Sequence, residues 1–172
     1  MPERLARLIR DIPDFPKPGI VFKDITPLLA DPAGLALAVE LMANPFRKSK
    51  VDLVVGAESR GFIFGTALAQ ALSCGFIPVR KPGKLPSQRS SISYALEYGT
   101  DALEMHADAV NGEHRVLMVD DLLATGGTMK ACCNLVEGHG ATIIGITVLI
   151  ELAFLKGRDK LKPHDVHSVL KY

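Results

Sequence analysis

Two adjacent carboxylates, Asp120 and Asp121, stand where the apolar run 115–119 ends. A loop of small residues ahead of an expected helix follows them, and it consists of Ala124, Thr125, Gly126, Gly127 and Thr128. Carboxylates accept hydrogen bonds from the vicinal hydroxyls of a sugar, and successive loop amides at a helix N-terminus hold a phosphate. The run 115–128 therefore predicts a sugar-phosphate receptor, with the acidic pair on the ribose and the loop on the phosphate.

Each half of this run also admits a purely structural interpretation. The acidic pair can be a solvated strand end, or Asp121 can cap a turn, and the glycines can serve only to begin the helix. The two halves together favour the receptor, because neighbouring carboxylates repel unless hydroxyls or cations meet them. The loop matches neither the G-x-x-x-x-G-K-S/T pattern nor the dinucleotide pattern G-x-G-x-x-G, so a monophosphate is the better ligand.

Apolar strands that alternate with helices must position this run. The expected strands cover 51–56, 76–80, 115–119 and 142–150, with an edge strand at 166–170. The expected helices cover 3–10, 62–73 and 127–138, and a further helix begins after its N-cap, Asp31. Strands that are apolar without alternation indicate a parallel sheet covered on both faces. Ligands of such sheets bind at the carboxyl ends of the strands, where the acidic pair falls.

Two segments, 13–19 and 81–99, are expected to be loops. Residues 13–19 contain three prolines and lead into a short strand at 20–25. Residues 81–99 form a long polar segment rich in Pro, Gly and Ser, and a loop of that length is usually functional or disordered. We expect this segment to be a mobile lid, with 88–92 at its tip, that excludes water when it closes.

Composition narrows the class of protein. The 172 residues are 48% hydrophobic and 23% charged with a net charge of +1, which is typical of one globular domain and unlike a nucleic-acid coat or an acidic-lipid binder. Three cysteines without paired spacing indicate a reducing compartment and show no zinc pattern. Residues 1–10 are too charged for a signal peptide, and no apolar run reaches the roughly 18 residues of a membrane span. We therefore expect a cytoplasmic protein that binds neither membrane nor nucleic acid.

The run 116–128 resembles the phosphoribosyl-diphosphate-binding motif of type I phosphoribosyltransferases, and its sequence is close to that of the members that use adenine. Other segments resemble, in the expected order, the purine-binding hood (15–25), the diphosphate loop (58–62) and the base and far arm of the mobile loop (80–86 and 93–99). The resemblance implies the α/β fold of that family, a central and mainly parallel sheet flanked by helices. It divides the single structural domain into an N-terminal hood (1–30) and a core (31–172) with the mobile loop.

The implied reaction is a step of purine salvage that forms AMP and diphosphate from adenine and 5-phospho-α-D-ribose 1-diphosphate. The resemblance also implies Mg²⁺, held mainly by the substrate diphosphate, and a homodimer. The alternatives are a sister transferase for the 6-oxopurines hypoxanthine, guanine or xanthine, and a non-catalytic sensor of phosphoribosyl diphosphate. The hood favours adenine, and the stretch ahead of residue 13 is too short for the DNA-binding segment that such sensors usually carry.

The resemblance further implies roles for single residues. Glu97 is the implied catalytic group, which handles a proton near N7 or N9 of the purine. The diphosphate is expected to meet Arg60, Lys81, Lys84 and Tyr98. The adenine-binding residues are expected to be Val21, Phe22, Lys23 and Leu122, with Phe22 and Leu122 on the two faces of the ring. Lys23 stands where the family often has Arg, so the contact expected there is through the backbone.

Overall fold

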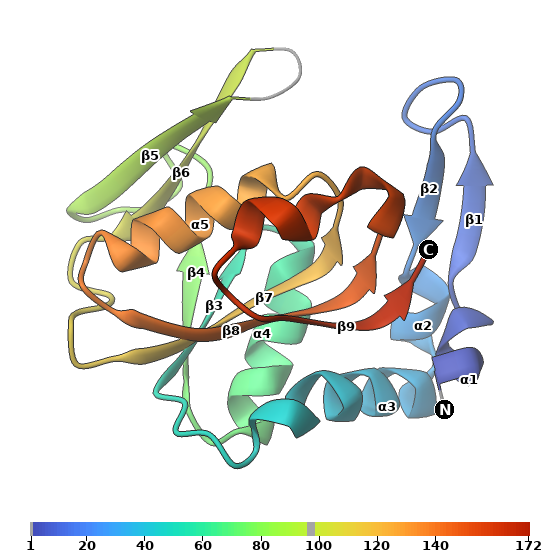
Figure 1. Cartoon of the computed structure of the whole chain (residues 1–172), viewed down its shortest axis with the longest axis horizontal. Coiled ribbons are helices and arrows are strands. Elements are labelled where there is room, and N and C mark those ends of the chain that lie inside the picture. Colours follow the sequence, from blue (N-terminus) through green and yellow to red (C-terminus); the bar gives the residue numbers. More distant parts are fainter. Residues whose placement is uncertain (1, 96–98) are drawn as a thin grey trace.

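A five-stranded parallel sheet forms the centre of the protein, in a computed structural model that describes residues 2–95 and 99–172 (Figure 1). Its strand order is β4-β3-β7-β8-β9, and every neighbouring pair is parallel. The strands are β3 (Leu53–Ala57), β4 (Gly75–Val79), β7 (Arg115–Leu123), β8 (Thr142–Glu151) and β9 (Val166–Lys171). The predicted parallel sheet is confirmed, and so is the edge strand expected at 166–170.

Helices cover both faces of this sheet, as the unbroken apolar strands predict. The covering helices are, on one face, α3 (Pro32–Ala43) and α4 (Arg60–Ala71) and, on the other, α5 (Gly127–Glu137). Successive residues of β7 supply the two layers, because side chains alternate along a strand. Leu117 belongs to the buried cluster of Phe64 in α4, whereas Met118 belongs to that of Cys132 in α5. Asp31 is the N-cap of α3, as predicted.

The hood is an antiparallel hairpin with a short helix on each side. Its elements are α1 (Pro2–Ala6), β1 (Arg10–Pro13), β2 (Val21–Asp24) and α2 (Thr26–Ala30). The helix expected over 3–10 is shorter than predicted, because Arg10 already pairs with Asp24 in the hairpin. Leu5 and Leu28 are buried in the same cluster as Met42 of α3, so the hood is packed onto the core.

A second hairpin begins at residue 89, within the segment expected to be a long loop over 81–99. It consists of β5 (Arg89–Ala95) and β6 (Thr100–His106). The prediction that 88–92 form the tip is wrong, because Arg89 pairs with His106 and Ile92 with Leu103 within the hairpin. Residues 96–98 lie outside the described residues. Exposure alternates along β5, whose outer face carries Arg89, Ser91, Ser93 and Ala95, and this mixed composition conceals the strand in the sequence.

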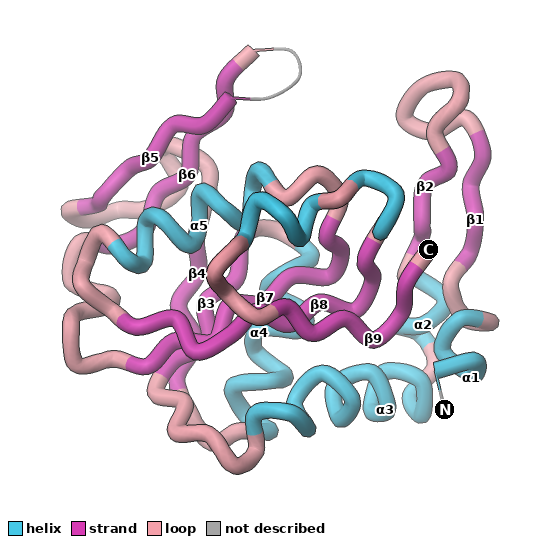
Figure 2. Tube along the Cα trace, viewed as in Figure 1, coloured by secondary structure: helices cyan, strands magenta, loops and turns pink. Residues whose placement is uncertain are grey.

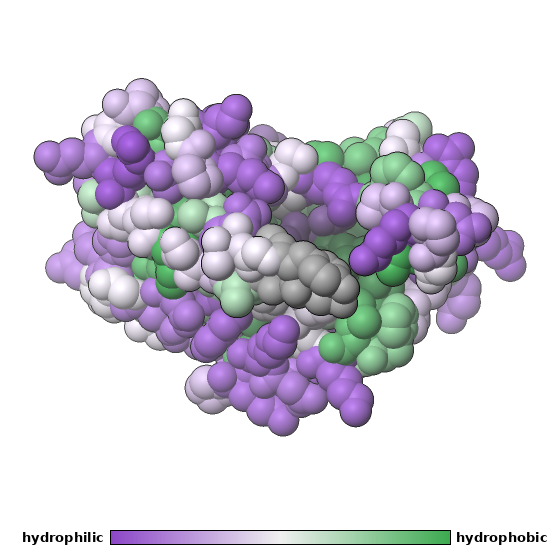
Figure 3. Space-filling model, turned by 90° about the horizontal axis from the view of Figure 1, so that it is seen from above, coloured by the Kyte–Doolittle hydropathy of each residue, from purple (hydrophilic) through white to green (hydrophobic). Residues whose placement is uncertain are grey.

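The two hairpins flank the edge at which the strands of the sheet end (Figure 1). Three short 3-10 helices complete the fold among the described residues: η1 (Asn44–Phe46), η2 (Ala153–Leu155) and η3 (Gly157–Leu161). The tube view shows both hairpins projecting from the rest of the fold, with β5 packed beside α5 (Figure 2). Seen from above, hydrophobic residues gather on the side of the N-terminal hairpin and hydrophilic ones on the side of β5 and β6 (Figure 3). No helix in the described part of the chain combines the length and the apolar character needed to cross a bilayer.

Candidate active site

A cavity of about 240 Å³ opens at the carboxyl ends of β3 and β7. It brings together the acidic pair (Asp120 and Asp121), the whole glycine loop (residues 124–128) and the turn that joins β3 to α4. Its lining residues are Glu58, Ser59, Arg60, Asp120, Asp121, Leu122, Leu123, Ala124, Thr125, Gly126, Gly127, Thr128 and Met129. The edge of the sheet that the strand pattern pointed to is therefore the edge that holds a cavity.

The acidic pair lies within β7 and not beyond it. The prediction that this strand ends at Val119 is wrong, because Asp120 pairs with Val148 and Leu122 with Ile150 of β8. Ladder pairing on both sides of the acidic pair fixes its backbone more firmly than a loop would.

The two carboxylates have different surroundings. Asp121 is 4% exposed, and its amide donates a hydrogen bond to Oδ1 of Asp120 at 2.8 Å. Burial, followed by the negative charge of Asp121, raises the pKa of Asp120 well above its usual range. The pair thus holds hydrogen-bond acceptors in a desolvated position, where hydroxyl or cationic partners gain the most.

The glycine loop carries the chain from β7 into α5. Gly126 is buried with φ +82, a left-handed conformation that glycine adopts without strain, and α5 begins at the next residue. The amides of the first turn of α5 have no partner within the helix, so the loop and the helix end together can receive an anion. The hydroxyl of Thr128 lies 3.3 Å from that of Tyr94 in β5, which connects the loop to the second hairpin.

Arg60 connects the core to the hood. It is the first residue of α4, and its Nε lies 3.0 Å from Oδ2 of Asp121. Its guanidinium carbon lies 5.1 Å from the centre of the Phe22 ring in β2. One side chain therefore touches a residue predicted to bind ribose and a residue predicted to bind adenine.

The basic residues after β4 lie beside the β3–α4 turn but do not line the cavity. The amide of Lys81 donates a hydrogen bond to Glu58, and its Nζ lies 3.3 Å from Asp101 of β6. Lys84 is exposed and has no side-chain hydrogen bond or ion pair with another described residue. Glu97 and Tyr98, the other residues predicted for this side of the site, lie outside the described residues.

None of the three predicted hood residues Val21, Phe22 and Lys23 lines the cavity, and Phe22 reaches the site only through its contact with Arg60. Val21 is 48% exposed, and the Phe22 ring packs edge-on against Phe15 with centroids 5.2 Å apart. The ammonium of Lys23 lies 2.7 Å from Asp11 and 3.9 Å from the centre of the Tyr172 ring. The side chain of Lys23 is thus engaged by Asp11 and Tyr172 and does not line the cavity.

Comparison with known proteins decides the family. The family model of the phosphoribosyl transferase domain matches residues 24–171. An adenine phosphoribosyltransferase of Solibacter usitatus is 56% identical over 172 residues, which cover 100% of this chain and 99% of the relative. The chain is a member of the adenine phosphoribosyltransferase family.

Solved structures of the adenine phosphoribosyltransferase family have the same fold. The crystal structure from Thermoanaerobacter pseudethanolicus is similar with a TM-score of 0.97 and 51% identity, and 100% of each chain is covered. The structure from Saccharomyces cerevisiae, complexed with adenine and D-2,5-dideoxy-2,5-imino-altritol 1,6-bisphosphate, has a TM-score of 0.93, 39% identity and 98% coverage of each chain. The expected fold of type I phosphoribosyltransferases is therefore confirmed.

Several residues in or beside the cavity had no individual role predicted from the sequence. Glu58 and Ser59 line the cavity, and they could have been found because they stand directly before Arg60 at a strand end. Tyr94 and Gly157 reach the glycine loop from β5 and η3, far away in the chain. Neither carries a local sequence signal, because both contacts depend on how distant segments pack.

The acidic residues of the cavity fit an Mg²⁺ ion that is shared with a substrate. The described residues include no group of three or more His, Cys, Asp or Glu side chains that could hold a metal ion alone. Mg²⁺ in phosphoryl sites is commonly bound by one or two carboxylates together with substrate phosphates. Asp120 and Asp121 supply such carboxylates, and Oδ2 of Asp121 is buried and, apart from its ion pair with Arg60, accepts no hydrogen bond from the described residues.

Proposed function

We propose that this chain forms AMP and diphosphate from adenine and 5-phospho-α-D-ribose 1-diphosphate, as an enzyme of purine salvage. The single observation that carries the proposal is the cavity that combines an acidic pair, a glycine loop at a helix N-terminus and Arg60 beside Phe22. The relatives that match the whole chain carry the name of this activity.

The two ends of the sugar diphosphate are bound by different parts of the site. The amides and hydroxyls of residues 124–128 bind the 5′-phosphate, and Asp120 and Asp121 accept hydrogen bonds from the ribose hydroxyls. Arg60, Lys81 and Lys84 meet the diphosphate, with Tyr98 closing over it. The location of Arg60 in the cavity wall supports its part of this arrangement.

The chemistry consists mainly of positioning and charge stabilisation. As the bond between C1 of the ribose and the diphosphate breaks, positive charge develops on the sugar ring and negative charge on the leaving group. The cationic side chains stabilise the diphosphate as it leaves, and the purine nitrogen attacks C1. Closure of the hairpin β5–β6 excludes water, which would otherwise hydrolyse the sugar diphosphate.

The purine is held between the hood and the core. Phe22 and Leu122 contact the two faces of the ring, while Val21 and Lys23 present backbone groups to its edge. The engagement of the Lys23 side chain with Asp11 supports a backbone contact at this position. Glu97 handles the proton of the purine near N7 or N9.

Mg²⁺ is held mainly by the diphosphate, with Asp120 and Asp121 as the protein carboxylates within the cavity. When bound, it neutralises negative charge on the leaving group. A homodimer in the cytoplasm is part of the same proposal, and the three free cysteines support a reducing compartment. Analytical ultracentrifugation of the purified chain tests the dimer, and sedimentation as a monomer at micromolar concentration would contradict it.

A side-by-side assay of four purines tests the proposed reaction. Adenine, hypoxanthine, guanine and xanthine are each supplied with phosphoribosyl diphosphate and Mg²⁺, and nucleotide formation is measured. We expect AMP from adenine, with kcat/KM for each 6-oxopurine lower by at least about 100-fold, because backbone groups that read a 6-amino edge are left unpaired by a 6-oxo group. Turnover of a 6-oxopurine without adenine would favour the sister transferase, and no turnover of any purine would favour a sensor.

A further inference from the structure

The segment that follows β8 passes directly behind the glycine loop. Gly157, the first residue of η3, is buried, and a Cβ placed on it would lie 2.2 Å from the carbonyl oxygen of Ala124 and 3.0 Å from the amide nitrogen of Gly126. A Cβ on Gly126 would in turn lie 2.5 Å from the carbonyl oxygen of Gly157. Backbone is therefore packed against backbone here, and neither side has room for a methyl group.

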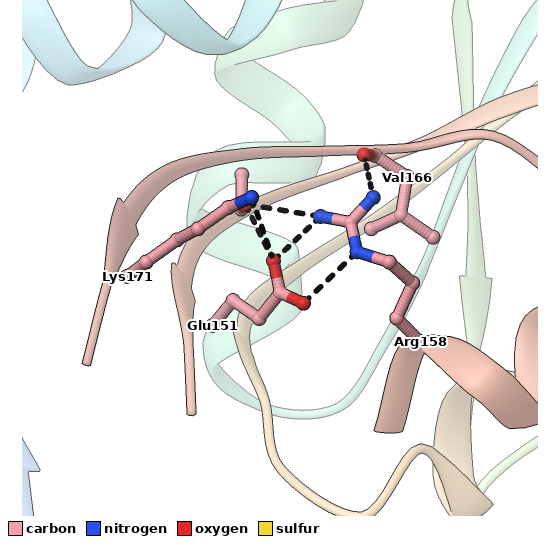
Figure 4. Close-up of polar contacts among 5 residues, drawn as sticks. Glu151, Arg158, Val166 and Lys171 are labelled. Atoms are coloured by element: carbon pink, nitrogen blue, oxygen red, sulfur yellow. Dashed lines mark hydrogen bonds and ion pairs between the residues drawn. The ribbon is translucent and has the colours of Figure 1, made fainter. Parts of the chain in front are cut away.

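An ion pair between Glu151 and Arg158 holds this segment in place (Figure 4). Arg158 donates from Nε and Nη2 to the two oxygens of Glu151, at 3.0 and 2.6 Å, in the bidentate geometry that gives the strongest carboxylate pairing. Its Nη1 donates to the carbonyl of Val166 at 2.5 Å. The Glu151 carboxylate, on a residue that is only 5% exposed, also accepts from Ser168 at 2.6 Å.

These contacts join three parts of the chain. Glu151 is the last residue of β8, Val166 and Ser168 lie in the edge strand β9, and Arg158 is bonded to Gly157. Hydrogen bonding from Arg158 is the largest effect that lowers the pKa of Glu151, so the carboxylate stays charged near neutral pH. Gly157 is consequently tethered to the sheet by a charged pair whose carboxylate is buried and whose guanidinium is partly exposed.

We propose that Glu151 and Arg158 are positioning residues that keep Gly157 against the glycine loop and thereby set the affinity of the site for the 5′-phosphate. The inference rests on the proposed function, in which this loop binds that phosphate. Loop amides bind an anion well only when they are held in the binding geometry beforehand, and a shift of about 1 Å in a binding group can cost about 100-fold in rate. The amide of Gly126 cannot retreat from the phosphate while Gly157 stands behind it.

The alternative is that the pair merely anchors the C-terminal segment to the sheet. In that case its loss would lower the melting temperature without a selective effect on any ligand. The two roles are separated by comparing ligands for different parts of the site. Ribose 5-phosphate probes the 5′-phosphate loop, whereas diphosphate and adenine probe regions that do not touch Gly157.

The decisive variant is Glu151→Gln, which keeps the shape of the side chain and removes its charge. Arg158→Lys is the companion, because it keeps the charge and loses the bidentate fork. Calorimetric titration with ribose 5-phosphate is expected to show a Kd raised roughly tenfold in both variants, with the KM for phosphoribosyl diphosphate raised to match. The Kd for diphosphate and the KM for adenine are expected to stay within about twofold of wild type, a change too small to indicate a lost contact.

Asp159→Asn is the matched control. Asp159 lies in η3, two residues from Gly157, and its replacement breaks an exposed ion pair with Lys162, at 2.9 Å, without touching the Glu151 pair. This variant should bind ribose 5-phosphate like wild type. Gly157→Ala is the severe variant, for which we expect ribose 5-phosphate binding weakened by more than about 100-fold if the chain folds.

The inference is overturned if folded Glu151→Gln and Arg158→Lys bind ribose 5-phosphate like wild type, or if all three ligands weaken equally. Circular dichroism and thermal melting establish that the variants are folded. If Gly157→Ala does not fold, the two ion-pair variants decide the question. Failure of the proposed function looks different, since wild-type protein would then show no transfer to any purine.

Discussion

Nε of Arg60 lies 3.0 Å from Oδ2 of Asp121. The contact joins the N-terminus of α4 to the acidic pair in β7, and the Asp121 carboxylate is almost fully buried. A buried charge of this kind needs a partner, so the arginine compensates the carboxylate until ribose hydroxyls do so. In the proposed reaction the two groups must separate in part, because Asp121 turns to the ribose and Arg60 to the diphosphate.

Replacement of Asp121 by Asn tests the ribose contact. The substitution keeps the shape of the side chain and removes a charged acceptor, and a hydrogen bond to a charged group contributes roughly 1.5–3 kcal/mol. We therefore expect the KM for phosphoribosyl diphosphate to rise by about 10- to 100-fold, measured from initial rates at saturating adenine. Asp108→Asn, in an exposed turn, is the control. An unchanged KM would remove Asp121 from the site.

Replacement of Glu97 by Gln tests the proposed proton transfer. General acid–base catalysis contributes roughly 100- to 10,000-fold, so kcat should fall within that range while the KM values of both substrates change little. Single-turnover experiments separate the chemical step from product release. Glu113→Gln, at an exposed carboxylate just before β7, should leave kcat unchanged. Full activity of the Glu97 variant would show that the residue is a bystander.

Removal of the Tyr94 hydroxyl tests the link between the second hairpin and the phosphate loop. This hydroxyl lies 3.3 Å from that of Thr128 and 3.5 Å from Oδ2 of Asp101, which in turn pairs with Lys81. A neutral hydrogen bond contributes about 1 kcal/mol, so Tyr94→Phe should raise the KM for phosphoribosyl diphosphate about fivefold. The measurement is a substrate titration at fixed adenine. Tyr172→Phe, which keeps its ring beneath Lys23, serves as the control, and equal KM values for both variants would contradict the link.

The acid limit of stability should depend on Asp24 in the hood. Hydrogen bonding from Thr26, first through its side chain and then through its amide, and next from Arg10, lowers the pKa of Asp24 to about 2. Because the folded-state pKa lies below the unfolded value near 3.9, the contribution is complete above that value and is lost as the pH falls toward 2. Thermal melting between pH 2 and pH 5 should therefore show a steeper acid loss for wild type than for Asp24→Asn. Parallel curves would refute this role.

Much of the architecture could be predicted because it follows from local sequence patterns, such as apolar runs and helix-capping residues. Unbroken apolar runs indicated the parallel sheet, and Asp31, as a typical N-cap residue, indicated the start of α3. The second hairpin could not be predicted in this way, since the exposed face of β5 mixes charged, polar and small residues and the strand depends on pairing with β6 and on packing against the core. The extension of β7 through the acidic pair was missed for the same reason, because ladder pairing with β8 overrides the polarity of Asp120 and Asp121.

The sequence by itself determined the parts of the candidate site whose residues are neighbours in the chain. The acidic pair and the glycine loop belong to one strand–loop–helix unit, so their types and spacing already describe a receptor for a sugar phosphate. Only the tertiary structure decided which distant groups meet that unit: Arg60 on Asp121, Phe22 on Arg60, Tyr94 on Thr128 and Gly157 behind Gly126. These contacts join segments brought together by the packing of strands, helices and hairpins, and a contact of that kind leaves no periodic or local signal in the sequence.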